Sequence, residues 1–212
     1  MTLRLILVRH ARTRWNEEGR LQGRADAPLS KAGVGQSREL AHILRSRGTF
    51  AALHVSPQRR TVETARVLAA ELVRAAGPKP ELKLWPELAE MALADWEGCT
   101  FAEVAAADPV GYADFWDAPQ RFAGAPGGGE SFHALLERVR GYLWRIRDEE
   151  PPGDILVVTH SLTIKAIRLA ISGGRLEEFW AESEFMSDHY CICEHDARGW
   201  SVGPVGKLGW NG

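Results

Sequence analysis

Two short aliphatic runs, each followed by a histidine, dominate the hydrophobic pattern of the chain. The first covers residues 3–8 and leads into Arg9 and His10, and the second covers residues 155–158 and leads into His160. Short runs rich in branched residues, of which the first is interrupted only by Arg4, are typical of strands buried on both faces in a parallel sheet. Neighbouring parallel strands lie about 4.8 Å apart and ligands bind beyond their carboxyl ends, so the two imidazoles are predicted to face one crevice. A single run that ended in a polar loop would mean little, but two such ends favour a site.

The remaining segments show helical and strand patterns in alternation. Helices are predicted from Ser30 to Gly48, over 59–72, over 131–148 and over 161–171, with shorter ones over 101–108, 110–116 and 175–180. Strands are predicted over 50–56 and 81–85, and a hairpin over 190–194 and 200–205. Ser30 and Ser161 are expected to be N-caps. We therefore expect an α/β fold, a three-layer sandwich with a mostly parallel central sheet and helices on both faces.

The alternation breaks at about residues 88–130. Short helical patterns are separated there by loops rich in proline and glycine, which end in Gly127, Gly128 and Gly129. Such a break between two strands of a sheet predicts a small inserted lid of helices and loops over the strand ends. Most aromatic side chains of this segment are expected to form the core of the lid, with one or two facing the pocket. Residues 1–212 are predicted to form one domain.

Composition and charge exclude several classes of protein. The hydrophobic content of 45% and the charged content of 25% are those of an ordinary globular protein. A net charge of −2 argues against general binding to nucleic acids or to anionic membranes. The chain has neither an apolar stretch of the roughly 18 residues that span a bilayer nor the pattern of a signal peptide. Cys99, Cys191 and Cys193 lack CxxC spacing, which fits unpaired thiols and a cytoplasmic location.

Arginine is concentrated near the first histidine. Six arginines occur within the first 24 residues. Guanidinium groups pair well with phosphate or carboxylate oxygens, although some of these side chains are expected simply to face solvent. Arg59 and Arg60 stand at a predicted helix start, where a cation is unfavourable unless an anion lies there, so either is a ligand candidate. His54 lies within a strand and is expected to be a core residue.

Five sequence blocks together resemble the histidine phosphatase superfamily, which includes the cofactor-dependent phosphoglycerate mutases. They are LVRHARTRWN (7–16), SPQRRTVETA (56–65), LAE (88–90) with WEG (96–98), GGES (128–131) and VVTH (157–160). The blocks follow the order of the family over almost the whole chain. One block alone would be a weak signal, whereas the set is specific.

The resemblance implies a role for each matching residue. His10 would be the nucleophile that takes up the phosphoryl group, and Glu90 would give a proton to the leaving oxygen. Phosphate oxygens would be held by Arg9, Arg60 and His160, with Asn16, Gln22, Gly23 and Ser161 lining the same pocket. A protonated His160 would be the more natural holder of the anion, but the sequence does not fix its protonation state.

Two of these choices exclude a neighbouring residue of the same type. Arg60 is chosen over Arg59 because it stands four residues before Thr64 in the matching block. Glu90 is chosen over Glu87 because it completes the Leu-x-Glu pattern.

The chemistry agrees with these roles. Phosphoryl transfer needs mainly positioning and neutralisation of charge. A neutral imidazole can attack phosphorus in line, and the phosphohistidine divides hydrolysis into two easier steps. Nearby arginines would keep His10 neutral by lowering its pKa. The sequence contains no HExxH or HxH pair and no evident carboxylate cluster, so we expect catalysis without a metal ion or other cofactor.

Three positions depart from the common pattern of the family. Ala11 and Ser161 replace the glycines that follow the two histidines, and Arg12 stands where Gln or Glu is usual. The first two changes are small and leave the phosphate pocket plausible. Arg12 adds a positive charge that would favour a second anionic group on the substrate.

The leading interpretation is a metal-independent phosphomonoester hydrolase that acts on a small phosphorylated metabolite. Candidate substrates implied by the resemblance are α-ribazole phosphate, phosphoserine, sugar phosphates and phosphoglycerates. A cofactor-dependent phosphoglycerate mutase is one alternative, and a non-catalytic phospholigand-binding protein is another, since a fold alone does not prove activity. We expect a small phosphate ester as ligand, no nucleic acid or membrane partner, and a homodimer as one possible assembly.

Overall fold

A six-stranded sheet forms the middle of the molecule, with strand order β3-β2-β4-β1-β5-β6. The computed structural model describes residues 2–73, 80–181 and 189–207. The strands are β1 (Leu3–Arg9), β2 (Ala52–Val55), β3 (Glu81–Leu84), β4 (Gly153–Thr159), β5 (His189–Asp196) and β6 (Gly199–Lys207). Strands β1 to β4 pair in parallel, and β5 and β6 add an antiparallel hairpin beside β1. The predicted mostly parallel sheet and hairpin are confirmed.

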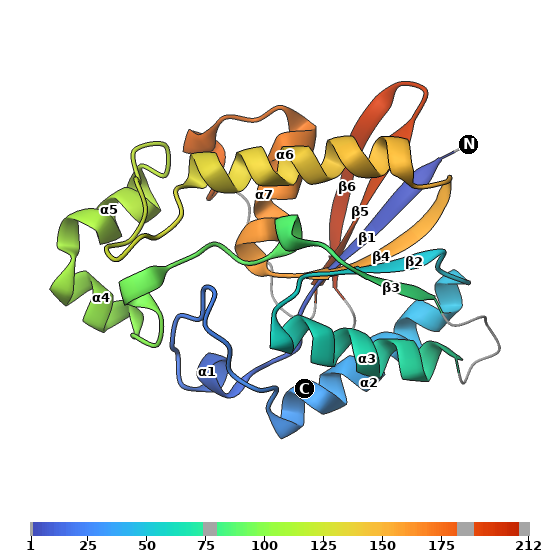
Figure 1. The fold of residues 1–212 in the computed structure, drawn as a ribbon, viewed down its shortest axis with the longest axis horizontal. Coiled ribbons are helices and arrows are strands. Elements are labelled where there is room, and N and C mark those ends of the chain that lie inside the picture. The colour runs from blue at the N-terminus through green and yellow to red at the C-terminus, as the bar shows by residue number, and fades with distance from the viewer. Residues whose placement is uncertain (1, 74–79, 182–188, 208–212) are drawn as a thin grey trace.

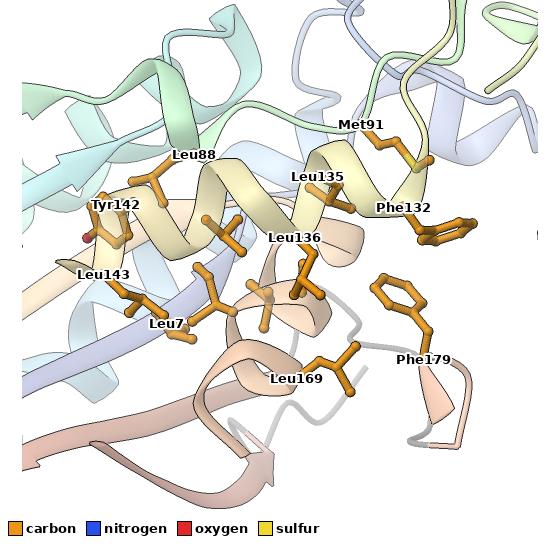
Figure 2. Packing of buried hydrophobic residues seen from close by; sticks show 14 of the residues in the cluster. Leu7, Leu88, Met91, Phe132, Leu135, Leu136, Tyr142, Leu143, Leu169 and Phe179 are labelled. Carbon is orange, nitrogen blue, oxygen red and sulfur yellow. The ribbon is translucent and has the colours of Figure 1, made fainter. Parts of the chain in front are cut away.

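Helices cover both faces of the sheet (Figure 1). On one face lie α2 (Lys31–Leu44) and α3 (Arg59–Val73), and on the other lie α6 (Phe132–Glu149) and α7 (Ser161–Ser172). Successive side chains of β1 point to opposite faces, so Leu5 and Leu7 join one buried cluster while Ile6 and Val8 join the other. Figure 2 shows α6 packed over Leu7 through its apolar face. The three-layer sandwich is therefore confirmed.

The shorter elements lie mostly outside these layers. They are α1 (Arg14–Glu17), α4 (Phe101–Ala107), α5 (Pro109–Asp117) and the 3-10 turns η1 (Arg45–Arg47), η2 (Pro86–Leu88), η3 (Ala94–Trp96) and η4 (Leu176–Glu178). The helix predicted over 175–180 is thus only a 3-10 turn. Across the described residues, no helix has the length and apolar character needed to cross a membrane.

The segment between β3 and α6 lies beside α1 at one end of the molecule (Figure 1). The backbone of Leu21 donates to the carbonyl of Cys99 at 2.9 Å, which joins this segment to the loop after α1. Trp96, Phe115 and Phe122 pack with ring centroids 5.3–5.6 Å apart. The segment therefore has an aromatic core of its own, as the sequence analysis expected.

The start of α7 differs from its prediction by one residue. Ser30 caps α2 as expected, accepting a hydrogen bond from the backbone of Gly33 at 3.1 Å. The N-cap of α7 is His160 rather than Ser161, because the extended backbone of His160 continues from β4 and Ser161 is already helical. A carboxylate oxygen of Glu90 accepts the backbone N–H of Leu162 at 3.4 Å instead. The N-terminus of α7 is thereby joined to Glu90, a residue of the predicted site.

His54 is a buried core residue, as expected. Its Nδ1 lies 2.9 Å from the hydroxyl of Tyr142 and its Nε2 lies 3.1 Å from a carboxylate oxygen of Glu150. Burial lowers the pKa of His54 to about 4, although Glu150 opposes this change. The neutral imidazole therefore joins β2 to α6.

Unfolding should become easier as the pH falls towards 4. The unfolded chain protonates His54 near pH 6.5 and the folded chain only near pH 4. The stability that neutral His54 contributes is present in full above pH 6.5 and is lost as the pH falls to about 4, by roughly 3 kcal/mol. In His54→Gln, which keeps a neutral polar group, the loss in unfolding free energy should shrink by about that amount. Urea denaturation between pH 7 and pH 4 measures it, and identical pH dependence in both proteins would contradict the assignment.

Candidate active site

His10 stands directly after β1, and contacts at both of its ring nitrogens fix its tautomer. Nδ1 lies 2.8 Å from the carbonyl oxygen of Ala11. A carbonyl can only accept, so Nδ1 carries the proton and donates it. Nε2 therefore has a lone pair, which accepts a hydrogen bond from Nε of Arg60 at 3.3 Å. The unprotonated nitrogen is the one held beside the guanidinium group.

The surroundings of His10 favour its neutral form. Burial lowers the pKa of His10 well below 6.5, and the positive charges of Arg60 and Arg9 lower it further, against the opposing hydrogen bond to Ala11. The neutral state expected from the nearby arginines is thus found, but removal from water is the larger cause. At neutral pH the lone pair on Nε2 is available for attack.

Arg60 is almost completely buried, and the loop over residues 23–26 surrounds its guanidinium. Nη2 donates to the carbonyl of Gly23 at 2.8 Å, and Nη1 donates to the carbonyl of Ala25 at 2.9 Å. Nη1 also pairs with a carboxylate oxygen of Asp26 at 3.0 Å. These contacts aim the guanidinium edge that carries Nε at His10.

The N-terminus of α3 already has an anion, which the sequence analysis did not identify. The carboxylate of Asp26 accepts the backbone N–H groups of Arg59 at 2.6 Å and of Arg60 at 3.3 Å. The two arginines at a helix start are therefore compensated by the protein itself. Arg59 is exposed and pairs with Glu63 at 2.6 Å, so Arg60 is the one that faces the pocket.

His160 follows β4, and its ring centroid lies 5.2 Å from that of His10. Its Nε2 lies 2.7 Å from the hydroxyl oxygen of Ser56, whereas Nδ1 is buried with no hydrogen-bond partner in the part of the chain that the structure describes. Burial lowers the pKa of His160 well below 6.5, and Arg60 is the next cause. This direction disfavours the protonated form of His160, because a cation at this depth beside Arg60 is unfavourable.

Glu90 follows η2 and places its carboxyl group at the start of α7. One carboxylate oxygen accepts from the backbone of Met91 at 3.0 Å and from the hydroxyl of Thr163 at 3.2 Å. Glu87, the alternative carboxylate, instead pairs with Arg145 at 2.8 Å and does not line the pocket. Geometry therefore favours Glu90.

A pocket of about 590 Å³ opens beside His10. The predicted site residues that line it are Arg9, His10, Asn16, Gln22, Gly23, Arg60, Glu90 and Ser161. His160 is fully buried behind His10 and is not part of the lining. The structure thus brings all of the predicted site residues together.

The rest of the pocket lining consists of apolar residues and a few charged ones. Leu21, Leu93, Phe101, Phe115, Trp116, Leu162 and Trp180 supply apolar surface, and Arg12, Glu17, Arg20 and Lys165 supply charge. Three of the aromatic residues come from the 88–130 segment, slightly more than the one or two expected. Within residues 2–73, 80–181 and 189–207, no group of three or more His, Cys, Asp or Glu side chains is arranged to hold a metal ion.

Glu97 organises the pocket, although the WEG block suggested no role for it. Its carboxylate accepts the backbone N–H groups of Arg24 at 2.7 Å, Ala25 at 2.8 Å and Leu93 at 3.0 Å. Gly23 has a φ of 52°, and a Cβ there would collide with this carboxylate. The loop that holds Arg60 is therefore locked to the segment that follows Glu90, and only glycine fits at the junction.

Comparison with known proteins agrees with this geometry. Residues 5–205 match the histidine phosphatase superfamily (branch 1). Metal-independent phosphoserine phosphatase of Arabidopsis thaliana is 32% identical, over 81% of this chain and 71% of the relative. Phosphoserine phosphatase 1 of Hydrogenobacter thermophilus is also 32% identical, over 84% and 81% respectively. The solved structure of Bacillus stearothermophilus YhfR superposes with a TM-score of 0.85 at 30% identity, over 94% of this chain and 95% of that one.

The chain belongs to the histidine phosphatase superfamily, and its enzyme class is that of a phosphatase. The resemblance seen in the five sequence blocks is confirmed.

Replacing Arg60 should raise the pKa of His10. In Arg60→Met one of the positive charges that lower this pKa is removed, while most of the burial remains, so the pKa should rise but stay below 6.5. The exposed neighbour provides a matched control, because Arg59→Met should leave the pKa of His10 unchanged. Titration of the His10 ring by NMR, assigned with a His10→Gln spectrum, measures the change. Equal titration in both variants would contradict the electrostatic role of Arg60.

Proposed function

We propose that this protein hydrolyses phosphate monoesters of small metabolites without a metal ion, through a phosphohistidine at His10. The observation that carries the proposal is the unprotonated Nε2 of His10, which Arg60 contacts at 3.3 Å beside a pocket that Arg9 also lines. A neutral nucleophile next to two guanidinium groups suits attack on a phosphoryl dianion.

The reaction proceeds in two balanced steps. In the first, Nε2 of His10 bonds to phosphorus as the ester P–O bond breaks, and Glu90 gives a proton to the leaving oxygen. In the second, Glu90 takes a proton from water, which attacks phosphorus as the P–N bond breaks and inorganic phosphate forms. Arg9 and Arg60 neutralise the phosphoryl oxygens in both steps.

Neighbouring polar groups complete the phosphate site. We assign Asn16, Gln22, Gly23 and Ser161, which line the pocket, to contacts with phosphate oxygens. His160 lies behind His10 and outside the pocket lining, so we assign it a contact with the anion only if its Nε2 exchanges Ser56 for a phosphate oxygen.

The pocket beyond the phosphate supports a substrate with an apolar part and a second charge. Phe101 and Trp116 offer apolar surface for the leaving group, while Arg12 and Lys165 offer positive charge to a carboxylate. Two relatives are named as phosphoserine phosphatases, and the carboxylate of phosphoserine would suit the positive charge of the exposed Arg12. We keep phosphoserine as the first substrate to test.

Several wider features stay proposals. We infer one domain over residues 1–212, although its two ends lie outside the described residues, and a lid over residues 88–130, which the contribution of Phe101 and Trp116 to the pocket supports. We also infer a cytoplasmic protein, which the thiols of the three cysteines support, and no nucleic acid partner, which the net charge of −2 supports. The homodimer stays a prediction, and light scattering tests it.

Removal of the nucleophile should abolish hydrolysis. In His10→Ala the hydrolysis of p-nitrophenyl phosphate should fall by at least ~10³-fold, because no other group can form the intermediate. The exposed His133→Ala variant is the control and should keep wild-type activity. Quenched turnover followed by ³¹P NMR under alkaline conditions should reveal phosphohistidine in the wild type alone. Activity that EDTA removes and a divalent ion restores would contradict the mechanism.

The fate of the phosphoryl group separates the proposed function from its alternatives. Enzyme loaded with labelled phosphoryl group should release labelled inorganic phosphate, at the same rate with or without 3-phosphoglycerate, because water is the acceptor. Transfer of label to 3-phosphoglycerate would identify a mutase. Binding of phosphate esters with no labelled protein and no turnover would identify a non-catalytic binding protein.

A further inference from the structure

Gln58 lies in the turn between β2 and α3, and both ends of its side-chain amide are used. Oε1 accepts the backbone N–H of Glu90 at 2.7 Å, and Nε2 donates to the carbonyl oxygen of Gly23 at 2.7 Å. Because a backbone N–H can only donate and a carbonyl can only accept, these two partners fix the orientation of the amide. The side chain is buried, with 7% of its surface exposed.

This amide lies at the junction of the groups that surround the phosphate site. The carbonyl of Gly23 that it contacts also accepts from Nη2 of Arg60 at 2.8 Å. Its Oε1 lies 3.2 Å from the hydroxyl oxygen of Ser56, which is 2.7 Å from Nε2 of His160. One side chain outside the pocket lining therefore touches, directly or through one neighbour, the segments of Arg60, Glu90 and His160.

The contact between Gln58 and the backbone of Glu90 affects where the carboxyl group of Glu90 lies. The carboxyl of Glu90 is held at its tip by Met91 and Thr163 and at its backbone by Gln58. Without the amide, the backbone N–H of Glu90 would be buried without that partner and the segment would shift to find one. A proton donor displaced by about 1 Å can lose on the order of 10²-fold in rate.

We propose that Gln58 is a positioning residue that sets the place of the Glu90 carboxyl relative to the leaving oxygen. The inference rests on the proposed role of Glu90 as proton donor. Gln58 does not touch the substrate, and Arg60 keeps its own contacts to Gly23, Ala25 and Asp26 when the amide is lost. The effect of Gln58 should therefore fall on proton donation and not on phosphate binding.

Two aryl phosphates that differ in their leaving group separate proton donation from the other steps. p-Nitrophenolate is a stable anion and leaves with little help from an acid, whereas phenolate needs the proton much more. Gln58→Met keeps the length of the side chain and removes both hydrogen bonds. For phenyl phosphate its kcat/KM should fall by about 10- to 100-fold, and for p-nitrophenyl phosphate by less than about threefold. The value of kcat/KM is compared because it does not include the later hydrolysis of the phosphohistidine, which both substrates share.

Two reference variants complete the experiment. Glu90→Gln should show the same preference for the good leaving group, more strongly, and Gln58→Met should add nothing to it in the double variant. Tyr142→Phe removes another buried hydroxyl, the one bonded to His54, and should leave the ratio of the two kcat/KM values at its wild-type value. The ratio remains informative if Gln58→Met folds incompletely, because both substrates report on the same folded molecules.

The outcomes distinguish the inference from the proposed function. Suppose that Glu90→Gln slows phenyl phosphate more than p-nitrophenyl phosphate. If Gln58→Met then slows the two substrates equally, or slows neither, only the positioning role of Gln58 is overturned. A Glu90→Gln that lowers both rates equally would remove Glu90 as proton donor and the inference with it. Selective loss in both single variants, without further loss in the double variant, supports the inference.

Discussion

The buried guanidinium of Arg60 is the constraint on which the rest of the site depends. A cation removed from water needs hydrogen-bond partners on every side, and Arg60 finds them in two carbonyls, the carboxylate of Asp26 and Nε2 of His10. The loop over residues 23–26 must therefore fold around it. Glu97 then ties that loop to the segment after Glu90, so the side chains of His10, Arg60 and Glu90 are held in fixed relative positions.

The pairing of β1 with β4 places the two histidines. In the register of β1 and β4, Arg9 lies opposite Thr159, so the residues that follow, His10 and His160, leave the sheet side by side. At this distance two protonated rings beside Arg60 would repel one another. Burial favours the neutral form of both rings, and the contacts of His10 then make its Nδ1 a donor and its Nε2 an acceptor.

The sequence predicts the parts of this structure that repeat with a period and misses those that depend on contacts between loops. Aliphatic runs and helical spacing were enough for the sheet, its hairpin and the layers, and the resemblance was enough for the residues that meet at the pocket. Gln58 and Glu97 lie in matching blocks and Asp26 does not, but all three act through backbone groups far away in the sequence, so no local pattern gave them a role. The cap of α7 was wrong because it depends on how β4 passes into the helix, and the sequence left the protonation of His160 open because it depends on burial and on Arg60.

The hydrogen bond from Arg60 to the lone pair of His10 has a consequence for any anion that enters the pocket. Nε2 of His10 accepts from Nε of Arg60, so attack by this nitrogen requires that one hydrogen bond to be given up. The guanidinium need not move for this, because Gly23, Ala25 and Asp26 hold its other two nitrogens. The N–H that His10 releases then faces the pocket, where an anionic oxygen is a stronger acceptor than the imidazole that it replaces.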